Sequence, residues 1–542
     1  MGAIHYYEKE RVFKLDTPHT SYLIGIVDEE KFLGHIYYGA KITDYDVRAL
    51  MRTGEAPFVP SQNNRDRSSF LDAFPMEYPG HGVGDYRESA ISVSDKNGNT
   101  AVQPLYREHK IYAGKPGLPG LPATFGSEEE CETLEIVLAD EVLDLTVTLY
   151  YTAFYDVDVI TRSVRVTNHA KEPVYLTKVF STALDLDAED YRMLTLHGSW
   201  ARERQIEYRQ IGYGKQSVGS CRGESSHQEH PFVALVSANA GQEQGRVYGF
   251  HFVYSGNFLA QVEKNQFDSL RVVLGIHPQD FKWELKQDET FTAPEVVMTY
   301  SDAGLGRMTR TLHDLYRKHL IRSPYKDRER PVLINNWEAT YFDFDTEKLL
   351  AIAREAKKSG IEMLVMDDGW FGHRNDDNTS LGDWQVNEQK ITGGLKRLVD
   401  QVNEIGLEFG IWFEPEMISP DSDLYRTHPD WAIALPGRTP CRSRNQYVLD
   451  LSRKEVRDYA YECVASILRS ANIAYVKWDM NRQLTDLGSS ALPVENQGEL
   501  LHRYVLGVYE LQERLITEFP ELLLENCSGG GARFDPGMLY YS

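Results

Sequence analysis

The chain has 542 residues, more than one ordinary hydrophobic core accommodates, so two or more domains are expected. Its composition, 42% hydrophobic and 26% charged residues, is that of an ordinary globular protein and not of a disordered or fibrous one. The formal net charge of −23 argues against nucleic-acid binding, which requires basic patches that neutralise phosphates.

Several other classes of function lack sequence support. No run of about 18 apolar residues is present, so no membrane-spanning helix is expected. The N-terminus, MGAIHYYEKERVFKLD, lacks the apolar run of a secretory signal, and the expected location is the cytoplasm. Neither HExxH, a Walker loop nor GxGxxG after a strand occurs, so no metal ion or cofactor is predicted. The cysteines form no CxxC pair, which fits reduced thiols better than disulfides.

The first part of the chain has the pattern of β-structure. Residues 145–151 alternate between apolar and polar side chains, as a half-buried strand does. Residues 164–166 and 174–178 continue this pattern on either side of a turn at 168–173, and a hairpin is predicted there. Short strands with similar turns follow, so a β-sandwich domain is predicted over residues 1–302.

The chain changes character after this region. A helical linker is predicted over 303–330, where helical apolar spacing precedes the polar stretch SPYKDRERP. In the third predicted domain, 331–542, strands alternate with amphipathic helices. Asp345 and Gly360 are expected to begin and end the first of these helices, and Gly406 to end the second. Six strands are predicted, at residues 331–337, 361–370, 407–417, 447–452, 473–481 and 521–530.

Such alternation predicts a parallel sheet, either doubly wound or closed into a barrel. The barrel is favoured because nearly every predicted strand ends in polar or charged residues, and a (β/α)₈ barrel builds its site from those ends. A barrel of this kind has eight strands, and about six are predicted here. The expectation is therefore an incomplete barrel in a fragment.

The strand at 473–481 carries the most informative polar residues. Lys477, Asp479 and Asn481 are two residues apart, so a strand directs all three to one side. A carboxylate beside an ammonium group stays ionised, as a nucleophile requires. The alternative is a buried ion pair without a catalytic role, and the position at a strand end favours the catalytic interpretation.

Other strand ends carry residues suited to binding a sugar. Asp367 and Asp368 could hold two hydroxyls or a metal ion, or could cap a loop; Trp337 and Trp412 offer apolar faces for sugar C–H groups or could be core residues. The glycines after Cys527 allow the backbone to approach a ligand closely. Three further carboxylates are interpreted as structural: Glu414, Glu416 and Glu525.

Five ordered motifs then identify a family. WEATYFDF, LVMDDGWFG, GIWFEPEM, YVKWDMNR and ENCSGGGARFDPGMLYYS together resemble glycoside hydrolase family 36, the bacterial α-galactosidases. FPMEYPGHGVGDYR at 74–87 is similar to the N-terminal domain of that family. The resemblance implies a multidomain β and α/β protein: an N-terminal β-supersandwich, a catalytic (β/α)₈ TIM barrel and a C-terminal β-domain.

The resemblance also implies retaining hydrolysis of terminal α-D-galactosyl residues in galacto-oligosaccharides such as melibiose and raffinose. Asp479 matches the family's nucleophile, and the paired aspartates are expected to bind the 4- and 6-hydroxyls. The residues implied to line the galactose pocket are Trp337, Asp367, Asp368, Trp412, Arg444, Lys477, Asn481, Cys527 and Gly530. Family members are commonly tetramers, so a homo-oligomer is expected.

The family's acid/base aspartate lies shortly after the segment that matches MLYYS. The sequence ends at Ser542, and a C-terminal truncation before this aspartate is therefore expected. Activity of these residues alone is not implied, because a retaining mechanism needs two carboxyl groups. Alternative functions are a galactosyltransferase of the raffinose-synthase type, an α-N-acetylgalactosaminidase and a non-catalytic galactoside-binding fragment.

Overall fold

The computed structural model describes residues 2–27, 31–43 and 71–542, which form two compact units. The first unit consists of Met1–Cys221, His227–Leu320 and Asp535–Gly537, and the second of Arg222–Ser226, Ile321–Phe534 and Met538–Ser542. Each unit therefore includes a short segment that is distant in sequence from the rest of it.

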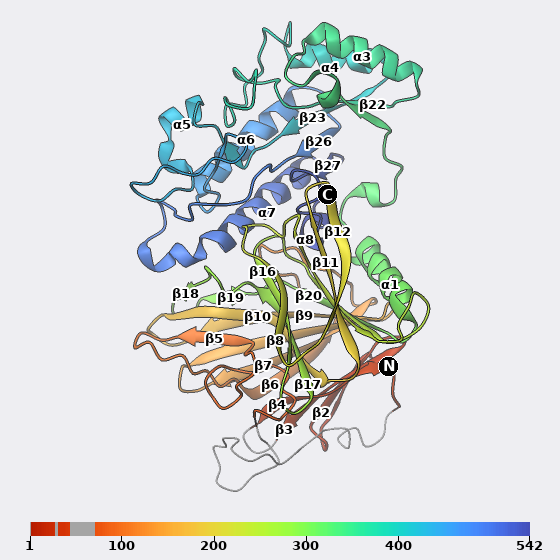
Figure 1. The fold of residues 1–542 in the computed structure, drawn as a ribbon, viewed down its shortest axis with the longest axis vertical. Coiled ribbons are helices and arrows are strands. Elements are labelled where there is room, and N and C mark those ends of the chain that lie inside the picture. The colour runs from red at the N-terminus through yellow and green to blue at the C-terminus, as the bar shows by residue number, and fades with distance from the viewer. Residues whose placement is uncertain (1, 28–30, 44–70) are drawn as a thin grey trace. The chain divides into compact units, whose positions relative to one another are not determined.

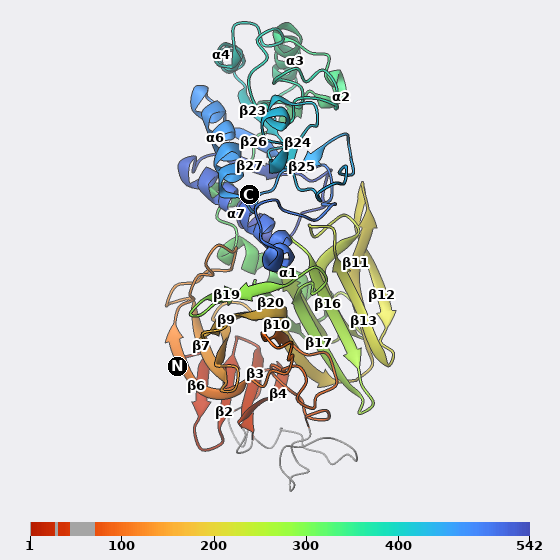
Figure 2. The same cartoon turned by 90° about the vertical axis from the view of Figure 1, so that its left-hand side faces the viewer.

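The described residues of the first unit form three antiparallel sheets (Figures 1 and 2). A four-stranded sheet has the order β1 (Ile4–Tyr7), β2 (Val12–Asp16), β3 (Thr20–Val27), β4 (Phe32–Ala40). A six-stranded sheet has the order β13 (Gly214–Ser220), β16 (Phe258–Lys264), β17 (Ser269–Ile276), β10 (Val174–Asp187), β18 (Trp283–Leu285), with β5 (Ile91–Ser94) paired to β10. The ten-stranded sheet has the order β12 (Arg202–Gln210), β11 (Tyr191–Ser199), β14 (Glu229–Ser237), β15 (Val247–Phe252), β20 (Val296–Ser301), β9 (Val159–Asn168), β8 (Leu145–Phe154), β7 (Cys131–Asp140), β6 (Leu105–Ala113), with β19 (Thr290–Thr292) paired to β9.

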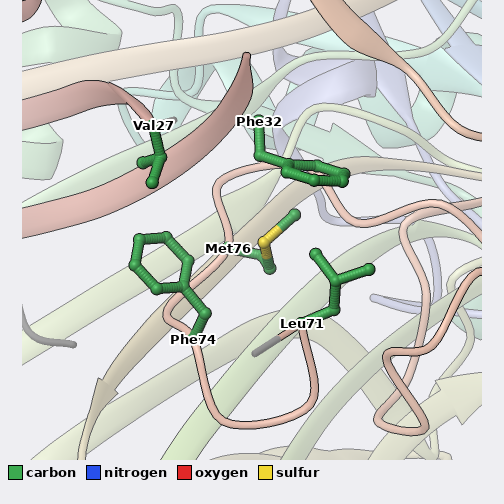
Figure 3. Close-up of a cluster of buried hydrophobic side chains, with 5 residues drawn as sticks. All are labelled: Val27, Phe32, Leu71, Phe74 and Met76. Carbon is green, nitrogen blue, oxygen red and sulfur yellow. The ribbon is translucent and has the colours of Figure 1, made fainter. Parts of the chain in front are cut away.

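Apolar side chains explain why these strands form sheets with buried faces. Along the first half of β8 buried residues alternate with half-buried ones, as the sequence pattern predicted. A separate apolar cluster joins β3 and β4 to the residues after position 70, and Figure 3 shows its five side chains gathered together: Val27, Phe32, Leu71, Phe74 and Met76. Burial of such side chains is the main favourable term in folding.

The prediction of a hairpin around the turn at 168–173 is wrong. β9 pairs with β8, β19 and β20, whereas β10 pairs with β5, β17 and β18, so the two strands belong to different sheets. The side chain of Asn168 donates hydrogen bonds to the carbonyl oxygens of Glu172 at 3.0 Å and Leu285 at 2.9 Å, where the chain leaves one sheet for the other. Alternation in a sequence shows which side chains are buried, not which strand is the partner.

The second unit contains a parallel sheet of five strands in the order β21 (Leu333–Asn335), β22 (Met363–Met366), β23 (Glu408–Phe413), β26 (Tyr475–Trp478), β27 (Leu523–Asn526). Figure 1 shows the longer helices of this unit beside the sheet. Its helices are α2 (Trp337–Thr340), α3 (Thr346–Lys358), α4 (Leu395–Ile405), α5 (Asp423–Thr427), α6 (Lys454–Ser470) and α7 (Leu500–Glu518). A partial α/β barrel of the predicted class is confirmed.

The strand predicted at 447–452 does not join this sheet. Only β25 (Tyr447–Val448) forms there, and it pairs antiparallel with β24 (Met417–Ile418). Asp450 ends the extended segment, because its carboxylate accepts hydrogen bonds from the backbone and hydroxyl of Ser452. The parallel sheet of the described residues thus has five strands, and the prediction of about six was one too high.

The predicted start and end of α3 and the predicted end of α4 are confirmed. The carboxylate of Asp345 accepts a hydrogen bond from the backbone of Lys348 at the start of α3, and Gly360, with φ +80°, follows its end. Gly406 ends α4 in the left-handed conformation, with φ +93°. In these cases a few consecutive residues determine the structure.

The remaining helices lie near the predicted linker and at the end of the chain. α1 (Gly304–His319) falls within the 303–330 segment and belongs to the first unit, while α8 spans Pro536–Leu539. The division at 302 and 330 stays a prediction. No helix in the described part of the chain is long and apolar enough to cross a membrane.

Candidate active site

The carboxylate of Asp479 lies at the end of β26 and is held by four donors. Its Oδ2 accepts hydrogen bonds from Trp412 Nε1 at 3.1 Å and Asn481 Nδ2 at 2.8 Å. Its Oδ1 accepts from the backbone of Met480 at 3.0 Å and of Gly529 at 3.4 Å. Asp479 is 6% exposed, so the carboxylate is nearly buried and its orientation is fixed from several elements.

Lys477 contacts a different carboxylate directly. Its Nζ lies 2.9 Å from Asp367 Oδ2, and the same oxygen accepts a hydrogen bond from Asn335 Nδ2 at 2.5 Å. Burial alone would lower the pKa of Lys477, but the carboxylates of Asp367 and Asp479 raise it. The ammonium group therefore stays charged between two carboxylates. The strand is shorter than predicted, because β26 ends at Trp478, and Asp479 and Asn481 follow it.

Asp368 has a separate cationic partner. Arg374 binds it with two nitrogens, Nε at 3.0 Å and Nη2 at 2.8 Å, in a nearly buried pair. Burial nevertheless raises the pKa of the Asp368 carboxyl group. The two adjacent aspartates that the sequence singled out thus have different environments, and Arg374 was not found by sequence reasoning because it stands alone in a loop.

The two tryptophans differ in what they contact. Trp412 is 2% exposed; besides its bond to Asp479, its backbone oxygen accepts a hydrogen bond from Trp370 Nε1 at 3.0 Å. Trp337 is the first residue of α2, partly exposed, with its ring edge-on to Tyr341 and Phe342 at centroid distances of 5.2 and 5.0 Å. Trp412 is therefore part of the Asp479 cluster, and Trp337 is an accessible aromatic face at the end of β21.

The glycine-rich turn after β27 contributes backbone groups. Gly529 and Gly530 have φ +52° and +93°, a region that favours glycine. In this turn Gly529 donates to Asp479, and Gly530 donates to Cys527 Sγ at 3.4 Å. Burial and the charge of Asp479 raise the pKa of the Cys527 thiol to about 12, so the thiol stays protonated and is not a nucleophile.

Arg444 reaches the cluster through Asn481. Its Nη1 lies 3.4 Å from Asn481 Oδ1, and the arginine is otherwise exposed. Arg444 and Asn445 both have positive φ, +51° and +60°. Two consecutive non-glycine residues with left-handed backbone conformation are uncommon, and such backbone strain is concentrated at functional sites.

Two glutamates after β23 have different surroundings. Glu416 is fully buried and bound by Arg533 at 2.7 Å, Trp478 Nε1 at 2.8 Å and the hydroxyl of Tyr504 at 2.6 Å, which supports the structural interpretation. Glu414 instead contacts the backbone of Asn481, next to the Asp479 cluster.

A segment from the N-terminal half of the sequence also supports the site. Arg222–Ser226 belongs to the second unit, and Glu224 accepts hydrogen bonds from Ser528 Oγ at 2.8 Å and Gln483 Nε2 at 3.3 Å. Ser528 lies in the glycine-rich turn that contacts Asp479. Sequence reasoning missed Glu224, because no local pattern connects residues that far apart.

The structure therefore brings together most of the predicted site residues. Direct contacts join Trp412, Asp479, Asn481 and Arg444 in one group and Lys477 and Asp367 in another. Among the described residues no group of three or more His, Cys, Asp or Glu side chains is arranged to hold a metal ion. The chemistry available is that of a buried, oriented carboxylate surrounded by hydrogen-bond donors and acceptors.

Two protein families match the chain. Melibiase matches residues 290–542, and the glycosyl hydrolase family 36 N-terminal domain matches residues 31–286. α-Galactosidase AgaA of Geobacillus stearothermophilus is 51% identical over 541 residues, which are 99% of this chain and 74% of the relative. α-Galactosidase Mel36A of Lactobacillus acidophilus is 47% identical over 543 residues, 100% of this chain and 74% of the relative.

Solved structures show the same fold. A crystal structure of an AgaA variant in complex with raffinose has a TM-score of 0.96 at 51% identity, covering 98% of this chain and 74% of that chain. A further AgaA variant was crystallised with stachyose, with the same TM-score of 0.96. The α-galactosidase from Lactobacillus brevis has a TM-score of 0.97 at 43% identity, covering 99% of this chain and 73% of that chain.

Proposed function

Because this chain belongs to glycosyl hydrolase family 36, we propose that it hydrolyses terminal non-reducing α-D-galactosyl residues in galacto-oligosaccharides such as melibiose and raffinose, with retention of configuration. The observation that carries the proposal is the carboxylate of Asp479, which four donors orient at the end of β26. The raffinose and stachyose complexes of relatives with the same fold support this substrate class.

In the proposed reaction Asp479 is the nucleophile. A carboxylate oxygen forms a bond to the anomeric carbon as the glycosidic C–O bond breaks, and the leaving oxygen takes the bonding electrons and a proton. Water then attacks the same carbon and releases galactose, restoring the carboxylate. An acid/base carboxyl group must supply and remove the proton.

The surrounding residues bind and orient the sugar in this proposal. Asp367 and Asp368 accept hydrogen bonds from hydroxyls, and Lys477 balances the charge of Asp367 and Asp479. Trp337 and Trp412 provide apolar faces, and Arg444, Asn481, Cys527 and Gly530 complete the lining. A buried, charge-paired carboxylate favours a ligand that offers several hydroxyl donors in fixed positions.

Two further expectations belong to this proposal. All five cysteines are unpaired, which supports a reducing compartment, and we propose that the protein acts in the cytoplasm.

A homo-oligomer is also proposed, from the family resemblance. Light scattering on the purified chain tests it: a monomeric mass would contradict it.

Intact-mass spectrometry after incubation with dinitrophenyl α-galactoside tests the function. This leaving group needs no protonation, so the first step requires only the nucleophile. We expect one hexose adduct, located on Asp479, in the wild type and in the control Asp400→Asn, an exposed residue of α4. Asp479→Asn should not be labelled. A folded wild-type chain without an adduct, or with one elsewhere, would contradict the assignment.

A further inference from the structure

Glu414 is a buried carboxyl group that the proposed mechanism does not use. It directly follows β23 and is 1% exposed. The groups that face it are the carboxylate of Asp479, the backbone of Asn481 and the side chain of Gln446. In the described part of the chain it has no cationic partner, unlike Glu416, which Arg533 binds. An ion pair therefore does not explain why this carboxyl group is buried, and its hydrogen bonds must be considered instead.

Its contacts connect two parts of the candidate active site. Glu414 Oε1 accepts hydrogen bonds from the backbone N–H of Asn481 at 2.5 Å and from Gln446 Nε2 at 2.6 Å. Asn481 in turn donates to Asp479, and Gln446 follows the strained pair Arg444 and Asn445. One oxygen atom thus holds both the turn after β26 and the loop that carries Arg444.

We propose that Glu414 is a positioning residue, which fixes the turn from Asp479 to Asn481 and the loop of Arg444 so that Asn481 is held against the nucleophile and Arg444 against Asn481. The role rests on the proposed function, because it requires Asp479 to be the reacting group. Orientation of this kind matters to rate: a displacement of about 1 Å at a reacting centre can cost about 100-fold.

The protonation state of Glu414 fits this role. Burial raises its pKa to about 8, and the negative charge of Asp479 contributes to the increase. This increase favours the protonated form, in which the carboxyl group adds no second negative charge beside the nucleophile. Glutamine has the same shape and the same accepting carbonyl oxygen, so we expect the Glu414→Gln variant to keep the positioning role.

Three variants test the role. Glu414→Gln keeps the acceptor, Glu414→Leu removes it, and Glu408→Gln changes an exposed glutamate at the other end of β23 as the control. The rate of dinitrophenolate release is measured in single-turnover experiments, and galactose affinity by calorimetry. We expect Glu414→Leu to slow release by about 10- to 100-fold and to weaken galactose binding by a smaller factor, and the two glutamine variants to stay within about 3-fold of wild type in both measurements.

The outcomes separate this role from a structural one and from the proposed function. The positioning role is overturned, with the function intact, if Glu414→Leu is labelled at Asp479 at the wild-type rate. It is also overturned if Glu414→Gln is slowed as much as Glu414→Leu. A folded wild type that is not labelled at Asp479 overturns both. If Glu414→Leu does not fold, Gln446→Leu removes one of the two donors and must slow release by a larger factor than it weakens galactose binding.

Discussion

The polar residues at the end of β26 have different partners: Lys477 contacts Asp367, and Asn481 donates a hydrogen bond to Asp479. Lys477, Asp479 and Asn481 were predicted to share one side of a strand, but β26 ends at Trp478, and only Lys477 lies within it. The sequence did not show that the ammonium group bonds to Asp367 and that Trp412 and Asn481 hold Asp479. The period of a strand fixes the side of a residue, whereas its partner depends on a neighbouring strand.

A prediction at this scale concerns the ion pair between Lys477 and Asp367. Lys477→Met leaves a carboxylate that is 3% exposed without its cation, and breaking such a pair costs about 3 kcal/mol. We expect a corresponding loss in the free energy of unfolding and weaker galactose binding. Urea denaturation and calorimetry measure both, with Lys396→Met, from an exposed pair on α4, as the control. Equal stability of the two variants would contradict the prediction.

Elements differ in how far local sequence defines them. α3 and α4 begin or end where capping residues predicted, because each cap acts over a few residues. The predicted hairpin and the strand at 447–452 were wrong, because sheet pairing depends on residues that are far apart. The contact of the segment Arg222–Ser226 with the glycine-rich turn could not be predicted, because Glu224 and Ser528 are 304 residues apart in the sequence.

The second prediction concerns this segment. Gly223 has φ +81°, and a Cβ there would lie 2.7 Å from the Cβ of Leu484. Gly223→Ala should therefore lower the free energy of unfolding by about 1–3 kcal/mol. It should also slow labelling of Asp479, because Glu224 would no longer hold Ser528 in place.

Gly212→Ala is the matched control, since its Cβ would have no atom within 4 Å. Thermal unfolding and the labelling rate are measured on both variants. A Gly223→Ala chain that behaves like Gly212→Ala would show that the segment does not support the site.

At the scale of the whole molecule, buried charges stabilise the first unit. Arg271 lies 2.7 Å from Asp185 and 2.8 Å from Asp85, and Arg87 lies 3.1 Å from Asp185. Burial would raise the pKa of Asp185, but the two guanidinium groups lower it below its usual value. These residues come from distant parts of the sequence and satisfy one another only in the folded unit.

The third prediction is that Arg271→Met lowers the free energy of unfolding by about 3–5 kcal/mol at pH 7, because it leaves buried carboxylates with less compensation. A depressed pKa contributes stability above the unfolded-state value and loses it as the pH falls. The difference from wild type should therefore shrink at acid pH. Urea denaturation at both pH values checks this, and Arg310→Met, from an exposed pair, should have little effect.

Sequence patterns alone predicted the β and α/β architecture, the caps of α3 and α4, and the strand ends near which Asp367, Asp368 and Asp479 lie. These features follow from the periodicity of apolar residues and from capping chemistry, which act over short stretches of chain. Tertiary contacts set the strand partners, the pairing of Lys477 with Asp367 and of Arg374 with Asp368, and the places of Glu224 and Glu414 beside the site. These depend on contacts between residues remote in sequence, whose hydrogen bonds and charges are matched only when the chain folds.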